Sequence, residues 1–574
     1  MLKLFCRQAA LVLFLLTSVS AVALAQEKTA KIDELVKRFN ELGQFNGSIL
    51  VAENGRVIYK KGFGYANMEW KIPNDVDTKF RLGSITKQFT STVILQLVEQ
   101  GKIKLDGKIT DYLPDYRKDT GDRVTIHQLL NHTSGIPSYT GQPGFFQNVS
   151  RNPFTVSDFV KKYASGDLEF EPGTKFKYNN SGYFLLGAII EKVTGKTYAD
   201  VVRENIFAPL GMNNSGYDTY SPLIAKRAEG YTKTAAGYVN AAYLDMSIPY
   251  AAGSLYSTVE DLYLWDQALF GDKILTAKSK ELMFKPTLDN YGYGLDIQDA
   301  ELGDKTKVAT IGHSGGINGF STNMIHFVAD KHMVVVLDNT GQGQFLRPII
   351  MSVVNILYGK PYETAKVPIG DLIAKTAVEK DVQAAIKQYR ELKASGSKEY
   401  NFGEDQLNNA GYQLLRAGKA KDAVEIFRLN VEMFPEGFNT YDSLGEAYEA
   451  AGDKELAIKN YKRSVELNPK NTNAAAAVKR LESPAVTVDT KTLERYVGQY
   501  ELAPGFVLAI TVENGKLNGQ ATGQPKFPME NISEGKFAVR SVGAEVVFVT
   551  DEKGVVTGLV LHQGGRDTPG KRLP

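Results

Sequence analysis

A repeat of 34 residues in the second half of the chain constrains the fold more than any other feature of the sequence. Five pairs of similar residues have this spacing: Gly411 and Gly445, Gly418 and Gly452, Ala423 and Ala457, Phe427 and Tyr461, Pro435 and Pro469. The period is that of stacked helix pairs, in which small residues let two helices approach and proline ends the second helix. Since two repeats are fewer than a stable stack needs, helices over 371–395 and 473–481 are expected to flank them.

The sequence before the repeats predicts a domain with an antiparallel sheet. Five strand-like runs occur near its two ends, at 46–52, 56–60, 308–311, 321–328 and 332–337. An Asn54-Gly55 turn joins the first two runs, as in a β-hairpin. Because helical sequence lies between the two groups of runs, we expect an α/β (α+β) domain with an antiparallel sheet and a largely helical subdomain.

The sequence after the repeats has a third pattern. From Tyr496 to Leu573, runs of about six residues alternate with turns that contain glycine, which predicts a small all-β barrel or sandwich. The chain of 574 residues is therefore expected to divide into a domain over 26–362, an all-α segment over 363–485 and an all-β domain over 486–574.

Residues 1–25 have the composition of a secretory signal. Lys3 and Arg7 precede an apolar run over 9–16, and Ala23-Leu24-Ala25 forms an A-x-A cleavage site. The apolar run is shorter than a membrane-spanning helix, so we expect no stable membrane span after cleavage and a periplasmic or secreted bacterial protein. The single cysteine, Cys6, lies in this signal, which excludes catalysis by cysteine in the mature chain.

Charge and histidine spacing exclude two further classes of function. Removal of the signal takes two of the 67 basic residues and none of the 65 acidic ones, so the mature chain is balanced and no nucleic acid is expected as a partner. The six histidines form no H-x-H or H-E-x-x-H pattern, so we expect no metal site. No cofactor is expected either.

The motif Ser84-Ile85-Thr86-Lys87 places a hydroxyl and an amine three residues apart, at the predicted start of a long helix. Residues at i and i+3 share a helix face, and the following apolar residues at i+4 spacing would bury that face. Burial lowers the pKa of a lysine. Lys87 could then take the proton from Ser84, which is the activation that a hydroxyl nucleophile needs. By itself the motif also fits an N-terminal serine followed by a lysine that reaches solvent.

Two further motifs follow in order. Tyr178-Asn179-Asn180 precedes an apolar helix over 183–193, and Gly312-His313-Ser314-Gly315-Gly316 lies between strand-like runs. Ser-x-x-Lys followed by these motifs is similar to the signature of penicillin-recognising enzymes. Over about residues 35–360 the chain resembles the class C β-lactamase, D-aminopeptidase and esterase branch of the serine β-lactamase-like and penicillin-binding protein family. The stretches 125–137, 253–261 and 291–294 share the resemblance.

The remainder of the chain resembles two other modules. The 34-residue period is similar to that of tetratricopeptide repeats. From these repeats we expect either a surface for a protein partner or a rigid spacer. Residues 493–502 resemble the start of the lipocalin-like tail that follows some β-lactamase-like hydrolases.

The resemblance implies a role for each residue of the first two motifs. Ser84 would attack a carbonyl and form an acyl-enzyme, and Lys87 would accept its proton. Tyr178 is the second candidate base, since an ammonium beside it would lower its pKa. Asn180 would orient Lys87 and bind a substrate amide, although capping of the helix is an alternative role.

The third motif is expected to bind the substrate. The backbone N–H of Gly316 would complete an oxyanion hole with that of Ser84, and Gly315 would allow close backbone approach. His313 stands where penicillin-recognising enzymes usually have lysine. Because imidazole is mostly neutral at pH 7, the substitution weakens pairing with a substrate carboxylate and places β-lactam and D-Ala-D-Ala substrates in doubt.

From these residues we expect a secreted serine hydrolase that cleaves an amide or ester, namely a β-lactam, a D-amino-acid peptide or a small ester. The alternative is a catalytically weak sensor of cell-wall fragments that binds a protein partner through its helical repeats. A further alternative places the nucleophile at Ser314, because Gly312 to Gly316 also fits G-x-S-x-G. That motif requires a helix directly after the serine, whereas a strand-like run follows here.

Overall fold

A computed structural model describes residues 26–142, 144–234, 237–482, 490–513, 515–539, 544–551, 553–563 and 566–573. The predicted signal over 1–25 lies outside these residues. The chain forms two compact units, of which the first contains the described residues up to 141 together with 152–368 and 398–401. The second contains 142–151, 369–397 and the described residues from 402 onward.

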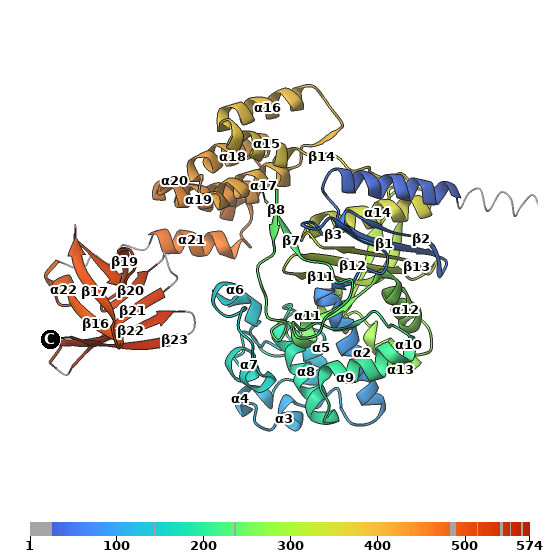
Figure 1. The fold of residues 1–574 in the computed structure, drawn as a ribbon, viewed down its shortest axis with the longest axis horizontal. Helices are drawn as coiled ribbons and strands as arrows, with labels where there is room; N and C mark the ends of the chain where they lie inside the picture. The colour runs from blue at the N-terminus through green and yellow to red at the C-terminus, as the bar shows by residue number, and fades with distance from the viewer. Residues whose placement is uncertain are drawn as a thin grey trace, which may run out of the picture. The chain divides into compact units, whose positions relative to one another are not determined.

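The first unit is built on a six-stranded antiparallel sheet with the strand order β10-β11-β12-β13-β1-β2 (Figure 1). The strands are β1 (Gly47–Glu53), β2 (Arg56–Phe63), β10 (Asp296–Glu301), β11 (Lys307–Ile317), β12 (Phe320–Phe327) and β13 (His332–Asp338). The predicted antiparallel sheet is confirmed. Asn54 and Gly55 both have positive φ, as the tight turn between β1 and β2 requires.

The two faces of this sheet carry different packing partners. Residues in register across it, such as Val51, Val334 and Ile325, pack with the helix over 26–41 and with α14 (Leu346–Leu357) in one apolar core. Side chains alternate along a strand, so the neighbouring register row points to the opposite face. His313 belongs to this second row, because it pairs with the buried Met324 of β12.

Helices from the middle of the chain form the subdomain that was expected. The longer ones are α2 (Thr86–Glu99), α7 (Val156–Tyr163), α8 (Asn180–Thr194), α12 (Val259–Leu269) and α13 (Ala277–Met283). Short elements that bear on the site are β5 (Phe80–Arg81), the 3₁₀-helix η1 (Gly83–Ile85), α5 (Ile126–Leu130), α9 (Tyr198–Val202), the π-helix η3 (Arg203–Phe207), α11 (Tyr250–Gly253) and β9 (Leu255–Ser257). All residues of α2 from Thr86 to Leu95 are buried, whereas its apolar pattern at i+4 predicted burial of one face only.

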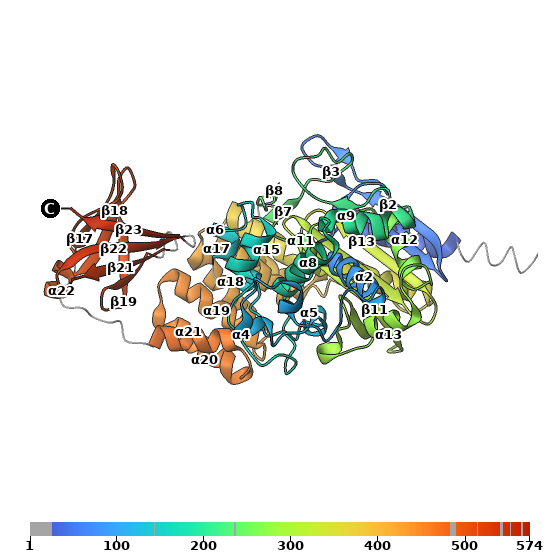
Figure 2. The ribbon, with the colours of Figure 1, turned by 90° about the horizontal axis from the view of Figure 1, so that it is seen from below.

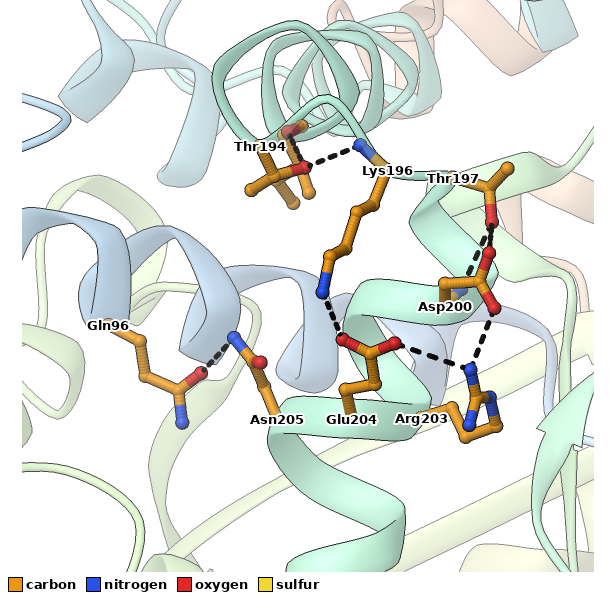
Figure 3. A network of polar contacts seen from close by, with 9 residues as sticks. Gln96, Thr194, Lys196, Thr197, Asp200, Arg203, Glu204 and Asn205 are labelled. Atoms are coloured by element: carbon orange, nitrogen blue, oxygen red, sulfur yellow. Dashed lines mark hydrogen bonds and ion pairs between the residues drawn. The ribbon is translucent and has the colours of Figure 1, made fainter.

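A polar network links the end of α8, the start of α9 and η3 (Figure 3). The Lys196 Nζ lies 2.6 Å from a Glu204 carboxylate oxygen, and Arg203 contacts both Asp200 and Glu204. Asn205 donates to Gln96 Oε1 of α2 at 3.3 Å. Exposed ion pairs contribute little to stability, so the packing of these helices depends mainly on their buried side chains. The network connects the ends of the helices.

The longer helices of the second unit pack against one another in succession. They are α15 (Ile369–Glu379), α16 (Val382–Ala394), α17 (Glu404–Arg416), α18 (Ala420–Met433), α19 (Phe438–Ala451), α20 (Lys454–Leu467) and α21 (Thr472–Glu482). A Cβ atom on Gly411 would lie 2.4 Å from the Phe427 ring, and one on Gly445 would lie 2.9 Å from the Tyr461 ring. The same glycine–aromatic contact thus recurs 34 residues apart. The tetratricopeptide assignment itself stays a prediction.

The C-terminal strands close into an eight-stranded barrel, which confirms the barrel form of the predicted all-β segment (Figures 1 and 2). Its strands are β16 (Gly498–Ala503), β17 (Phe506–Glu513), β18 (Lys516–Ala521), β19 (Phe527–Ser533), β20 (Lys536–Val539), β21 (Ala544–Thr550), β22 (Val556–Gln563) and β23 (Arg566–Arg572). Large side chains such as Tyr500 and Phe548 fill its core. The lipocalin-like assignment stays a prediction. Across the described ranges, no helix is long and apolar enough to cross a membrane.

Candidate active site

Ser84 is the exposed point of an otherwise buried segment. Every other residue from Arg81 to Thr90 is buried, whereas Ser84 is partly exposed. It lies in η1, a single 3₁₀ turn that leads directly into α2, and not in the first turn of the α-helix itself. The tighter turn leaves its side chain partly exposed and its backbone N–H at the N-terminal end of a long helix.

Lys87 is fully buried beside this serine. Its Nζ lies 3.0 Å from Ser84 Oγ, 2.8 Å from Asn180 Oδ1 and 2.9 Å from the Ala252 carbonyl oxygen. No carboxylate pairs with it among the described residues, and burial lowers its pKa well below the ordinary value of 10.5. A neutral amine has two N–H groups and one lone pair. In the neutral form, the two carbonyl oxygens would take both N–H groups and the lone pair would face Ser84.

Asn180 is oriented by a contact that the sequence did not suggest. Its Nδ2 donates to Thr140 Oγ1 at 3.1 Å, so its Oδ1 must face Lys87. The helix-capping alternative for Asn180 is wrong. Asn179 is the N-cap of α8 and accepts from the Gly182 N–H, which leaves Asn180 available to Lys87.

Tyr178 lies against the amine, as expected, but its expected pKa is wrong in direction. The Lys87 Nζ is 4.9 Å from the centre of its ring, and its phenol hydrogen-bonds with the Ser84 side chain. The residue as a whole exposes 37% of its surface, whereas its hydroxyl end lies deep among other groups. Burial raises the pKa of Tyr178 above 10, and the nearby Asp296 raises it further. The phenol is therefore protonated at neutral pH.

The glycines of β11 let two backbones meet beside Ser84. A Cβ atom on Gly315 would lie 2.0 Å from the Leu82 carbonyl oxygen, and one on Gly83 would lie 2.9 Å from the Gly316 nitrogen. Gly83 has a φ of +55°, which favours glycine. The close approach predicted for a ligand is thus made by the segment before Ser84.

Gly316 lies on the part of β11 that extends beyond its pairing with β10. β10 begins at Asp296, which pairs with Gly312, so β11 has no β10 partner beyond that point. A two-residue turn pairs Ile317 with Phe320, and backbone direction alternates along an antiparallel strand. The N–H of Gly316 therefore points away from β12, toward the Ser84 side.

Substitution of Gly315 and of Gly316 tests which of the two glycines is packed against the segment before Ser84. Gly315→Ala is expected to lower the thermal midpoint, because overpacking of this kind costs about 1–3 kcal/mol. Gly316→Ala should leave the midpoint unchanged, since nothing lies within 4 Å of a Cβ atom there. Thermal unfolding of the matched pair checks this, and equal midpoints would contradict the close contact.

His313 is held by the protein on both ring nitrogens. Its Nδ1 lies 2.5 Å from the Ser314 carbonyl oxygen and must donate to it, so Nε2 accepts from the Tyr291 hydroxyl at 2.9 Å. Burial, together with the nearby Lys87, lowers the pKa of His313 to about 3. Both contacts fit a neutral imidazole, which stays a prediction. Its ring lies 6.0 Å from that of Tyr178.

Asp296, the first residue of β10, carries a half-buried carboxylate. The sequence did not single out this residue. The carboxylate itself makes no hydrogen bond or ion pair with the described residues. Burial and the nearby Asp289 raise its pKa to about 6. The native state thus retains a proton that the unfolded chain has lost between pH 3.8 and 6, so the carboxylate destabilises the fold as pH rises through that window.

Asp296→Asn is therefore expected to stabilise the domain by about 2 kcal/mol at pH 7.5 and to change little near pH 3.5. The exposed Asp299 of the same strand serves as the matched control, Asp299→Asn. Thermal inactivation midpoints at both pH values measure the effect. An equal gain at both values, or none, would contradict the assignment of a raised pKa.

The geometry does not fit the alternative at Ser314. That serine lies within β11, and the chain continues through the turn at 318–319 into β12 with no helix following it. Besides Asp296, sequence reasoning missed Thr140 and the Ala252 carbonyl, and it gave no role to Tyr291. All of them lie in or near stretches that resemble the family, but spacing alone could not place Ala252 beside Lys87, Thr140 beside Asn180 or Tyr291 beside His313.

Comparison with known proteins matches the chain in two places. A family model described as "Beta-lactamase" matches residues 32–350, and a model described as "Domain of unknown function (DUF3471)" matches residues 482–572. Penicillin-binding protein 4* of Bacillus subtilis (strain 168) is 33% identical over 373 residues, which are 60% of this chain and 79% of that protein. Teichoic acid D-alanine hydrolase of Staphylococcus aureus is 30% identical over 274 residues, which are 46% of this chain and 65% of that protein.

A solved structure shares the fold of the first unit. The D-amino acid amidase from Ochrobactrum anthropi SV3, crystallised with L-phenylalanine amide, has a TM-score of 0.51 and 28% sequence identity to this chain. The alignment covers 59% of this chain and 99% of the amidase.

Proposed function

Because this chain belongs to the beta-lactamase and penicillin-binding protein family of serine hydrolases, we propose that it cleaves an amide or ester through an acyl intermediate on Ser84. The observation that carries the proposal is the environment of Lys87. A buried amine with no carboxylate partner among the described residues lies 3.0 Å from the serine hydroxyl, and its two other contacts are both acceptors. An amine whose pKa is lowered in this way can act as a general base.

In the first step, the lone pair of Lys87 takes the Ser84 proton as Oγ forms a bond to the substrate carbonyl carbon. The carbonyl oxygen becomes negative and is stabilised by the backbone N–H groups of Ser84 and Gly316. Collapse of this intermediate breaks the bond to the leaving group and leaves the acyl group on Ser84. Water then attacks the ester carbonyl carbon and gives a proton to Lys87, which passes it to Oγ as the bond between Oγ and the acyl group breaks and the acid is released.

We assign Tyr178 to proton donation and not to the first deprotonation. Its raised pKa keeps the phenol protonated, and its hydrogen bond with Ser84 places it where the leaving group departs. The phenol can give its proton to that group while Lys87, now charged, returns one to the phenol. Asn180 holds Lys87 in place throughout.

The state of His313 bears on the substrate. A neutral ring with both nitrogens engaged offers no cation to a substrate carboxylate. We therefore propose that uncharged amides and short esters are better substrates than β-lactams or D-Ala-D-Ala peptides. The names of similar proteins support the class of bond, since one is a D-amino acid amidase and another a teichoic acid D-alanine hydrolase.

A substrate panel tests this proposal. The mature protein would be assayed with p-nitrophenyl butyrate, D-phenylalanine amide, nitrocefin and a D-Ala-D-Ala peptide, each also with Ser84→Ala. Turnover of the ester or the amide that depends on Ser84 supports the proposal. No turnover and no labelling by a fluorophosphonate would contradict it and favour the sensor alternative.

The remaining assignments are proposals of the same kind. We place the catalytic domain at 26–362, tetratricopeptide-like helices at 363–485 and the β domain at 486–574, with export directed by residues 1–25. Helical repeats of this type commonly offer a concave surface to a protein partner. A periplasmic or secreted location agrees with similar proteins named as penicillin-binding and cell-wall enzymes.

A further inference from the structure

We propose that His132 is a positioning residue that fixes Tyr178 and Asn180 in their working geometry. It lies in the stretch 125–137, which has no role in the mechanism above, and this inference rests on the proposed function of the Ser84 site. The evidence for this role is that His132 accepts hydrogen bonds from both sequence neighbours of Tyr178.

Both bonds come from groups of the same histidine. The His132 carbonyl oxygen accepts the Lys177 N–H at 3.0 Å, and its ring Nδ1 accepts the Asn179 N–H at 3.1 Å. Tyr178 lies between these two residues in sequence. Its ring also packs on the imidazole, with ring centres 4.4 Å apart. The backbone on either side of the phenol is thus tied to one buried residue.

The neutral state of the ring is required for this clamp. An imidazolium has no acceptor nitrogen, so Nδ1 can accept the Asn179 N–H only when the ring is uncharged. The ring is 1% exposed, and burial lowers the pKa of His132 well below 6.5, as do the nearby Lys87 and His313. With Nδ1 accepting, the ring proton is on Nε2.

The environment of Nε2 argues against a role in packing alone. This nitrogen is buried and has no hydrogen-bond partner among the described residues, and the imidazole ring as a whole packs among the rings of Tyr178, Tyr183 and Tyr291. An unsatisfied buried donor is unfavourable. His132 also has a φ of +61°, which is unfavourable for a residue other than glycine. A phenylalanine would fill the same space without the unsatisfied nitrogen but could not accept the Asn179 N–H.

Two substitutions separate the acceptor from the ring. His132→Phe keeps a planar ring and removes the acceptor, whereas His132→Asn keeps an acceptor oxygen and tolerates positive φ. As a matched control, His127→Phe removes a histidine of the same stretch whose hydrogen bonds go to Tyr293 and Asn131. Ester turnover would be measured per site titrated with a fluorophosphonate, so that unfolded protein does not count.

We expect His132→Phe to lower kcat per titrated site by about 10- to 100-fold with KM nearly unchanged, because small displacements of catalytic groups have effects of this size. His132→Asn should restore kcat to within about threefold of the wild type, a factor well inside the usual context dependence of such effects. An unchanged kcat in His132→Phe, with only a lower thermal midpoint, would overturn the proposal. Equal losses in both variants would also overturn it.

A measurement on the unmodified protein remains decisive if His132→Phe does not fold. Nitrogen-15 spectra of its six histidines should show His132 as the Nε2–H tautomer and His313 as the opposite Nδ1–H tautomer. A His132 signal from the Nδ1–H form would exclude the hydrogen bond to Asn179. Loss of ester turnover on Ser84→Ala would stand in that case, so failure of this inference is distinct from failure of the proposed function.

Discussion

Replacement of Ser84 by alanine is expected to abolish turnover, with kcat lowered by about 10⁴-fold or more. The substitution removes the oxygen that would form the acyl bond and leaves Lys87 with its two carbonyl contacts intact. Since Ser84 is partly exposed and lies in a single turn, the fold should not change. Ester hydrolysis and the thermal midpoint measure the two effects.

Ser314→Ala is the matched control for that experiment. Ser314 is the serine of the competing G-x-S-x-G motif, and it is exposed on β11. We expect this variant to keep at least about half of the wild-type kcat, within the usual tolerance of an exposed site. A loss of acylation in Ser314→Ala with activity retained in Ser84→Ala would reverse the assignment of the nucleophile.

Replacement of Lys87 by methionine is expected to lower the acylation rate by about 10³-fold, the usual contribution of a positioned base. Methionine has a similar length and no lone pair on nitrogen, so Ser84 keeps its proton. Stopped-flow acylation by a p-nitrophenyl ester measures the rate. Lys87 is fully buried, and its proposed role is in the chemical step. The loss should therefore appear in kcat.

The pH dependence of the acylation rate tests the same role of Lys87. The base must be unprotonated, and burial places the pKa of Lys87 well below 10.5. Acylation should therefore rise with pH through that lowered pKa and level off before the ordinary range of lysine. The rising limb should be absent in Lys87→Met.

Lys177→Met is the control for this substitution. Lys177 adjoins Tyr178 and pairs with Glu169 at the surface, with more than half of its side chain exposed. It should retain wild-type acylation and the same pH profile. A comparable loss in both lysine variants would mean that general electrostatics, and not Lys87, supports the reaction.

Much of the fold could be predicted because its signals are local. The Asn54-Gly55 turn and the alternating strands depend on neighbouring residues, and the 34-residue period is visible when one stretch is compared with the next. Each predicts an element that the structure contains. The boundaries were less predictable. β11 extends to Ile317, well beyond the apolar run at 308–311, because the glycines that look like a loop continue the strand.

The candidate site was predictable only where a motif named its residues. Ser84 and Lys87 come together because they lie three residues apart in helical backbone, whereas Asn180 reaches Lys87 through a tertiary contact that only the resemblance of the Tyr-x-Asn motif indicated. The pKa of Tyr178 was not predictable, since its direction depends on burial among groups from distant stretches. Thr140 and the Ala252 carbonyl act through tertiary contacts that no spacing in the sequence encodes.

The most direct measurement is the position of a covalent adduct. The mature protein would be incubated with a fluorophosphonate, digested and mapped by tandem mass spectrometry. We expect a single adduct on Ser84, whose formation Lys87→Met slows strongly. An adduct on Ser314, or labelling of Ser84 at the wild-type rate in Lys87→Met, would contradict this expectation.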